Sequence, residues 1–214
     1  MHQNCQNVKK YESKEAEIGE EDEGRRLSPA PRTPRNTDEE GGRRPFVAAH
    51  FHGNTSHLTL GVDAHYHGNG LVRTPHEEVH SVWWPAAWTA AAPRPRPTLS
   101  GRGRVLVHRS GVYLVYVQVY YFDAHDTVGW VLHRTNAERE GRDALLQCTH
   151  AAPSVDHEEK PNSCFSAAAL LLHAGDRLAV RNTGGERHAI MNSEKSFIGL
   201  VQLADADDPE AVEL

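Results

Sequence analysis

The run from Ser110 to Phe122, SGVYLVYVQVYYF, most constrains the fold, because it predicts a strand that is apolar on both faces. Side chains alternate between the two faces of a strand. One face carries Val112, Leu114, Tyr116, Gln118, Tyr120 and Phe122, and the other carries Tyr113, Val115, Val117, Val119 and Tyr121. Parallel sheets bury both strand faces under helices, but no nearby stretch has the length and period of a covering helix. We therefore expect the second face to pack against a neighbouring subunit.

The composition bounds the class of protein. A length of 214 residues suits one domain with tails. The formal net charge of −6 argues against a general nucleic-acid binder. No apolar run reaches the roughly 18 residues that span a bilayer. The N-terminus, MHQNCQNVKKYESK, lacks the apolar core of a secretory signal, which taken alone predicts a cytoplasmic protein.

Three features favour an extracellular location instead. Cys148 and Cys164 lie at a spacing that suits a hairpin, Asn54-Thr55-Ser56 is an acceptor for N-glycosylation, and basic clusters near the N-terminus resemble processing sites. We expect an extracellular protein that is secreted or shed from a type II membrane precursor. Any membrane association would then depend on an anchor that this chain lacks.

The chain divides into three parts by composition. Residues 1–44 contain an acidic patch, Glu15–Glu23, followed by a segment rich in proline and arginine. Such a segment cannot offset its conformational entropy by burial, so it is expected to be a disordered stalk or linker. Residues 45–204 are expected to form the folded domain, and residues 205–214 an acidic C-terminal tail.

Within the folded part, short β-branched and aromatic runs alternate with turn formers. Expected strands are Phe46–His52, Leu58–Val62, Arg104–His108, Gly111–Asp123, Thr127–Arg134, Ala144–Thr149, Cys164–His173, Asp176–Asn182, Ala189–Asn192 and Phe197–Leu203. The stretch Val82–Pro97, with three tryptophans, is expected to be an irregular loop. This pattern predicts an all-β protein, an antiparallel jelly-roll sandwich.

Four segments of the chain resemble the TNF homology domain, and within that superfamily they are most similar to ectodysplasin and Eiger-type ligands. They are GVYLVYVQV (Gly111–Val119), LLQCT (Leu145–Thr149), CFSAAALLLHAGDRLAV (Cys164–Val180) and SFIGLVQL (Ser196–Leu203). The resemblance runs from about Pro45 to Leu203 and is most specific in the C-terminal half. It implies a compact homotrimer of jelly rolls, which agrees with the two-faced strand.

The family pattern places aromatic side chains near the three-fold axis. The corresponding residues here are Tyr116, Phe165 and Phe197, and the small Gly199 suits a close approach of strands to the axis. The alternative is that these aromatic side chains fill the core of a single subunit.

The cysteines have more than one interpretation from spacing alone. Cys148 and Cys164 could be reduced thiols, or metal ligands together with His150, although Cys-x-His plus one Cys does not match a structural zinc site. The resemblance implies a Cys148–Cys164 disulfide, because relatives bridge this loop. Cys5 is then left over, and it could link stalks, lie beside a membrane anchor or be an inert tail thiol.

The histidines raise an alternative, a metal enzyme of the cupin type, because cupins are also jelly rolls. Two His-x-His pairs occur, at His50/His52 and His65/His67. The cupin pattern needs a glutamate a few residues later, and Glu77 is too far away. Surface histidines are therefore favoured over a metal site. No catalytic residue, cofactor or metal ligand is assigned, and the protein is expected not to be an enzyme.

The resemblance implies a TNF-like cytokine whose trimer binds and clusters cysteine-rich TNF-receptor-type ectodomains. The alternative is a C1q-like or other jelly-roll adhesion module that binds carbohydrate or matrix. Candidate receptor-contact segments are Asp123–Thr127 and Gly53–His57. Arg32–Arg35 fits a minimal furin-type site, and Asn54 is a glycosylation candidate, both of which arise often by chance.

Overall fold

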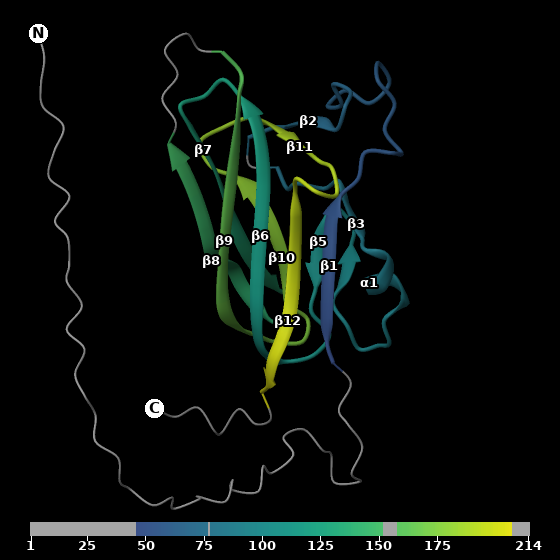
Figure 1. The fold of residues 1–214 in the computed structure, drawn as a ribbon. Coiled ribbons are helices and arrows are strands. Elements are labelled where there is room, and N and C mark those ends of the chain that lie inside the picture. The colour runs from purple at the N-terminus through teal and green to yellow at the C-terminus, as the bar shows by residue number, and fades with distance from the viewer. Residues whose placement is uncertain (1–45, 77, 152–157, 207–214) are drawn as a thin grey trace, which may run out of the picture. The chain divides into compact units, whose positions relative to one another are not determined.

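The computed structural model describes residues 46–76, 78–151 and 158–206, which form a sandwich of two antiparallel sheets (Figure 1). The sheet nearer the viewer in Figure 1, here called the front sheet, contains β1 (Ala48–Gly53), β2 (Leu71–Thr74), β3 (Trp83–Pro85), β6 (Gly111–Asp123), β9 (Lys160–Leu172), β11 (Arg187–Ile190) and β12 (Phe197–Asp205). The back sheet contains β4 (Thr98–Ser100), β5 (Arg104–Leu106), β7 (Thr127–Asn136), β8 (Arg139–Ala151) and β10 (Arg177–Asn182).

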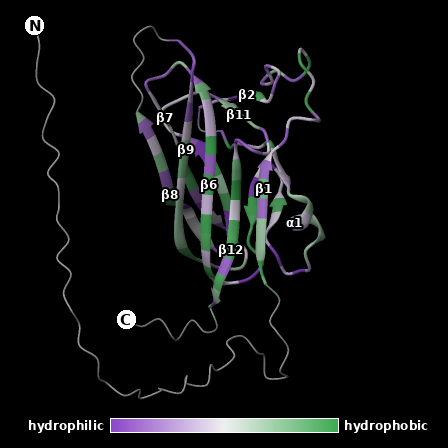
Figure 2. Ribbon diagram, viewed as in Figure 1, coloured by the Kyte–Doolittle hydropathy of each residue, from purple (hydrophilic) through white to green (hydrophobic). Residues whose placement is uncertain are grey.

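The core lies between the two sheets, and β6 supplies its centre. On one face of β6 every side chain from Tyr113 to Tyr121 is fully buried. Trp130 and Leu132 of β7 are buried in the same core from the back sheet. Hydrophobic residues run along much of β6 and β12 (Figure 2). The apolar pattern of the sequence therefore holds the two sheets together.

A disulfide joins the two sheets at one edge of the sandwich. Cys148 of β8 is bonded to Cys164 of β9, with 5.8 Å between their Cα atoms. Trp130 lies opposite Cys148 in the β7–β8 pairing, and its indole N–H donates a hydrogen bond to the Cys164 carbonyl at 2.9 Å. The bridge and the buried tryptophan therefore stabilise the same edge of the sandwich, where β8 of the back sheet lies beside β9, the strand that pairs with β6 in the front sheet.

Most of the expected strands are present, but one is wrong. Residues Leu58–Val62 form turns instead of a strand. The N–H groups of Val62 and Asp63 both donate to the Thr59 carbonyl, and Gly61 has a positive φ of 82°. The alternating pattern there was a coincidence of composition, because a glycine in the left-handed region bends the chain away from an extended course.

The expected irregular loop at Val82–Pro97 is also wrong in part. It contains β3, which pairs with β1 at the edge of the front sheet, and the short helix α1 (Ala87–Ala91). Thr89 of α1 exchanges hydrogen bonds with the backbone of His50. The short strands β2 and β4 were not expected from the sequence, and each gains its order by pairing with a neighbouring strand.

Several expectations lie outside the described residues. They are the stalk of residues 1–44, with Cys5 and the Arg32–Arg35 site, and the tail beyond residue 206. In the part of the chain that the structure describes, no helix has the length and hydrophobicity to cross a membrane.

Replacing both bridge cysteines, as Cys148→Ser with Cys164→Ser, should lower the free energy of unfolding by about 3 kcal/mol, because the bridge limits the entropy of the unfolded chain. Denaturant unfolding without reductant measures this difference, and Cys5→Ser is the control. Equal stability of the double variant and the control would show that the bridge does not stabilise the fold.

Candidate functional site

The outward-facing side of the front sheet, here called the front face, is the candidate site. Its side chains come from four adjacent strands, β9, β6, β12 and β1, in that order across the sheet. The pairing aligns them in rows that read Phe165, Gln118, Phe197, His52, then Ala167, Tyr116, Gly199, His50, then Ala169, Leu114, Val201, Ala48. The face therefore presents large and small uncharged side chains side by side.

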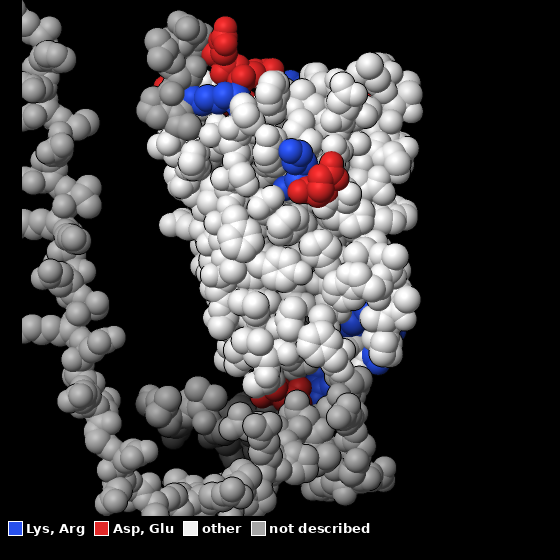
Figure 3. Space-filling model, viewed as in Figure 1, with Lys and Arg blue, Asp and Glu red and all other residues white. Residues whose placement is uncertain are grey.

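The front face leaves large apolar side chains in water. Phe165 is 54% exposed, Leu171 is 42% exposed and Leu114 is 38% exposed. A broad central band of this face is free of charged side chains in Figure 3, and the visible charges lie toward its ends and one side. Lys195, for example, lies over the Tyr120 ring near one end. Contiguous apolar surface of this kind marks an interaction site.

An aromatic cluster lies at the centre of the front face. The ring of His50 lies 5.9 Å from Tyr116 and 5.4 Å from Phe197, centroid to centroid, and Tyr116 meets Phe197 at 6.1 Å. The His50 Nδ1 and the Tyr116 hydroxyl are 3.0 Å apart and form a hydrogen bond. Three strands thus contribute one ring each to a single cluster.

Gly199 makes this cluster possible. A Cβ atom at this position would overlap the Tyr116 ring atoms Cζ and Cε2 and the hydroxyl oxygen Oη. Because Tyr116 is directly opposite Gly199 in the β6–β12 pairing, the ring lies flat across the space that a side chain would need. The glycine is therefore required by the tyrosine beside it.

Burial changes the ionisation of both polar members of the cluster. The pKa of His50 lies below its ordinary value of 6.5, first because burial disfavours the imidazolium and second because His52 is a nearby like charge. Burial raises the pKa of the Tyr116 hydroxyl. Both side chains are therefore neutral near pH 7.

Comparison with known proteins identifies the fold and the family. A family model described as TNF (Tumour Necrosis Factor) matches residues 96–203, half of the chain. The solved structure of Eiger TNF from S. frugiperda is 63% identical, with a TM-score of 0.70, and the match covers 78% of this chain and 98% of that chain. The chain belongs to the TNF family.

Two curated relatives are ligands of the TNF superfamily. Tumor necrosis factor ligand superfamily member 13 is 34% identical over 99 residues in Mus musculus, covering 46% of this chain and 40% of that protein. The Homo sapiens protein is 32% identical over 117 residues, covering 54% of this chain and 45% of that protein. The match spans less than half the length of these relatives. A crystal structure of murine APRIL at pH 8.5 shares the fold, with a TM-score of 0.53, 24% identity and coverage of 74% of this chain and 99% of that chain.

The predicted site residues of this TNF ligand are partly brought together. Tyr116, Phe197 and Gly199 are in contact at the centre of the front face, whereas Phe165 lies at the β9 edge, in the same row as Phe197. Sequence reasoning missed His50, which was interpreted as a surface histidine. Its signal was the two-residue period of β1, which puts His50 on the face opposite to Phe51.

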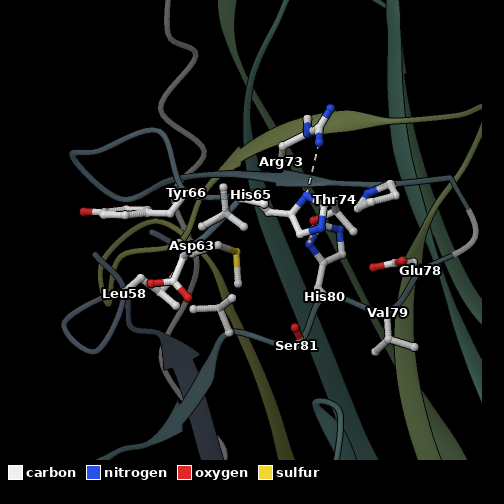
Figure 4. A pocket seen from close by; sticks show the side chains of 15 residues that line it. Leu58, Asp63, His65, Tyr66, Arg73, Thr74, Glu78, Val79, His80 and Ser81 are labelled. Atoms are coloured by element: carbon white, nitrogen blue, oxygen red, sulfur yellow. Dashed lines mark hydrogen bonds between the residues drawn. The ribbon is translucent and has the colours of Figure 1, made fainter. Parts of the chain in front are cut away.

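A separate hollow of about 170 Å³ lies beside β2 (Figure 4). His80 lines this hollow and is buried, and its Nε2–H donates to Asn182 Oδ1 at 2.7 Å. That oxygen also accepts a hydrogen bond from the Tyr121 hydroxyl. Burial lowers the pKa of His80 to about 4, although the hydrogen bond to Asn182 raises it. This neutral network connects both sheets, so we interpret it as structural.

The histidine pairs do not form a metal site in the described residues. There, no group of three or more His, Cys, Asp or Glu side chains is placed to hold a metal ion. The His65 Nδ1 lies 3.4 Å from an Arg73 nitrogen, and the His67 ring meets the His188 ring edge-on at 5.3 Å.

The loop Asp123–Thr127 is held in shape by a buried carboxylate. Asp123 accepts hydrogen bonds from the N–H groups of His188 and His125 and from the His125 side chain. Burial alone would favour the protonated acid, but these hydrogen bonds lower the pKa of Asp123 overall. The loop is therefore anchored at its start by Asp123, whereas the side chain of His125 remains 57% exposed.

Gly199→Ala should lower the free energy of unfolding by about 1–3 kcal/mol, because the added methyl group forces the Tyr116 ring or β12 to move. Gly101→Ala is the matched control, since a Cβ at Gly101 meets nothing within 4 Å. Urea unfolding compares the two variants. If both alanine variants unfold at the same urea concentration as the wild type, Tyr116 does not pack closely enough on Gly199 to exclude a side chain there.

Proposed function

We propose that this TNF ligand is a cytokine that assembles as a homotrimer through the front face and that the trimer clusters receptors. The observation that supports the proposal most is the central aromatic cluster of His50, Tyr116 and Phe197, half-buried on a face with few charges. An isolated chain would leave this surface in water, whereas a subunit contact would bury it.

The arrangement of apolar residues suits a ring of three chains. In a cyclic trimer each subunit contact is head-to-tail, so two identical chains meet through two different surfaces. Here exposed apolar side chains continue from the cluster to both borders of the front sheet, at Phe165 on β9 and at Trp84, which is 53% exposed on β3. One border of each chain could therefore cover the face of the next. In this proposal Tyr116, Phe165, Phe197 and Gly199 line the three-fold axis.

Each groove between adjacent subunits would then bind an elongated, cysteine-rich ectodomain of the TNF-receptor type. Two segments are candidates for the contact, Gly53–His57 and Asp123–Thr127, and both lie at the ends of front-sheet strands. A trimer that holds three receptors brings their intracellular parts together and raises the effective concentration of each binding site. The protein would act outside the cell, secreted or shed from a type II membrane precursor.

Tyr116→Ala should weaken the trimer, because each chain loses one ring from the shared cluster at a cost of about 3–5 kcal/mol. Sedimentation velocity over a dilution series measures the assembly, and binding to TNF-receptor-type ectodomains is measured on the same samples. Receptor binding should fall together with the trimer, since a groove needs two chains.

The matched control is Tyr66→Ala, which removes a ring from the loop beside β2. A Tyr116→Ala protein that remains trimeric, with only the stability of the single chain lowered, would place Tyr116 in the monomer core. A wild-type trimer that binds glycans but no receptor of this type would instead support an adhesion module.

The trimer should weaken as the pH falls. Within the single chain His50 has a lowered pKa, so its contribution to the fold is complete above the ordinary histidine pKa and is lost as the pH decreases through the folded value. Protonation would also place like charges in the proposed subunit contact, which is the reason to expect a weaker trimer. The groups that face it are His52 on its own strand, Tyr116 on β6, Phe197 on β12 and Thr89 on α1, none of which is acidic.

Sedimentation near neutral pH and at about pH 5 tests this dependence. His50→Gln, which cannot become charged, should reduce the difference between the two conditions. His108→Gln, in which an exposed histidine that bonds to Thr98 is replaced, should leave it unchanged. The same pH response in the wild type and in His50→Gln would contradict the role of His50.

A further inference from the structure

The loop after β1 carries the sequence Asn54-Thr55-Ser56 at the surface. The N–H of Leu58 donates to the Thr55 carbonyl at 2.9 Å, so Ser56 lies inside a reverse turn and is exposed. The N–H of Asn54 donates to the Val82 carbonyl at 3.1 Å, which fixes the start of the loop. The acceptor sequence is therefore held in place at the surface, with Ser56 exposed and Asn54 partly exposed.

The side chain of Asn54 is oriented with its nitrogen available. Its Oδ1 accepts a hydrogen bond from the Ser56 N–H at 2.9 Å, which forms an Asx turn. Among the described residues, no hydrogen bond involves the Asn54 Nδ2. A substituent on this nitrogen would therefore break no hydrogen bond within the described residues.

The surface beside Asn54 has room for a sugar. An open hollow of about 400 Å³ is lined by the loop and by Asn192, Ser193 and Glu194. Amide, hydroxyl and carboxylate groups are the partners that sugar hydroxyls bind. The hollow therefore offers polar contacts to the first sugars of a glycan.

The position of Asn54 is compatible with the proposed trimer. Asn54 follows the end of β1, two residues beyond His52, which pairs with Phe197 in the end row of the front face. The hollow beside it includes the charged Glu194, so the apolar surface has ended there. A glycan at Asn54 would extend from the rim of the front face and not from its centre.

We propose that Asn54 carries an N-linked glycan and that this glycan shields the Gly53–His57 loop, which leaves Asp123–Thr127 as the receptor contact. The proposal rests on the extracellular function proposed above, because the glycan is added in the secretory pathway.

In the modification, the Asn54 Nδ2 bonds to C1 of the first sugar of a lipid-pyrophosphate-linked oligosaccharide. The bond between that carbon and the pyrophosphate oxygen breaks, the lipid pyrophosphate leaves, and one amide proton is released.

The test uses the full chain, directed into the secretory pathway of cultured eukaryotic cells by an added signal peptide. Mass spectrometry before and after treatment with peptide N-glycosidase should show a glycan on the peptide that contains Asn54. Asn54→Gln and Ser56→Ala should lack it. Thr55→Ala is the matched control and should keep it, since the middle position of the acceptor sequence accepts any residue except proline. A wild-type mass that does not change on treatment would overturn the site.

Receptor binding tests the second half of the proposal. Ser56→Ala should bind a TNF-receptor-type ectodomain as tightly as the wild type, whereas His125→Ala should bind it about ten-fold more weakly. Weaker binding of Ser56→Ala, with His125→Ala unchanged, would make the Gly53–His57 loop the contact and overturn the shielding. A glycosylated trimer that binds no such receptor would confirm the glycan and overturn the proposed function.

Discussion

The strand β6 is apolar on both faces, and the rest of the structure depends on how each face is covered. The face from Tyr113 to Tyr121 is fully buried between the sheets and holds the sandwich together. The other face, with Leu114 and Tyr116, has no covering layer among the described residues, and β9 and β12 extend it on both sides. A surface of this composition is stable in water when a second chain covers it, which is the physical basis for the proposed trimer.

The same face combines tight packing with a group that can be charged. Tyr116 lies over Gly199, so the sheet itself sets the position of the ring. His50 approaches from β1 and is held by the Tyr116 hydroxyl on one side and by Phe197 on the other. Since the ring of His50 is neutral near pH 7, the cluster carries no charge where extracellular proteins usually act. Protonation would place like charges in the proposed subunit contact.

The sequence predicted strands best where one face of the strand is buried in the core, because the buried residues then alternate along the chain. The bounds of β6 were predicted correctly, and the family of the protein followed from motifs in β6, β9 and β12. It was least informative for segments that depend on a neighbour. β3 is ordered by β1, and Leu58–Val62 alternates like a strand although Gly61 turns the chain. The role of His50 was also hidden, because its contact with Tyr116 joins residues 66 positions apart.

The mass of the unmodified full chain in solution tests the central claim most directly. Sedimentation equilibrium at neutral pH without reductant should give three times the chain mass of 23.8 kDa, because the front face is then buried in each subunit contact. A mass of one chain across the whole concentration range would contradict the account, since the apolar face around Tyr116 would then be stable in water.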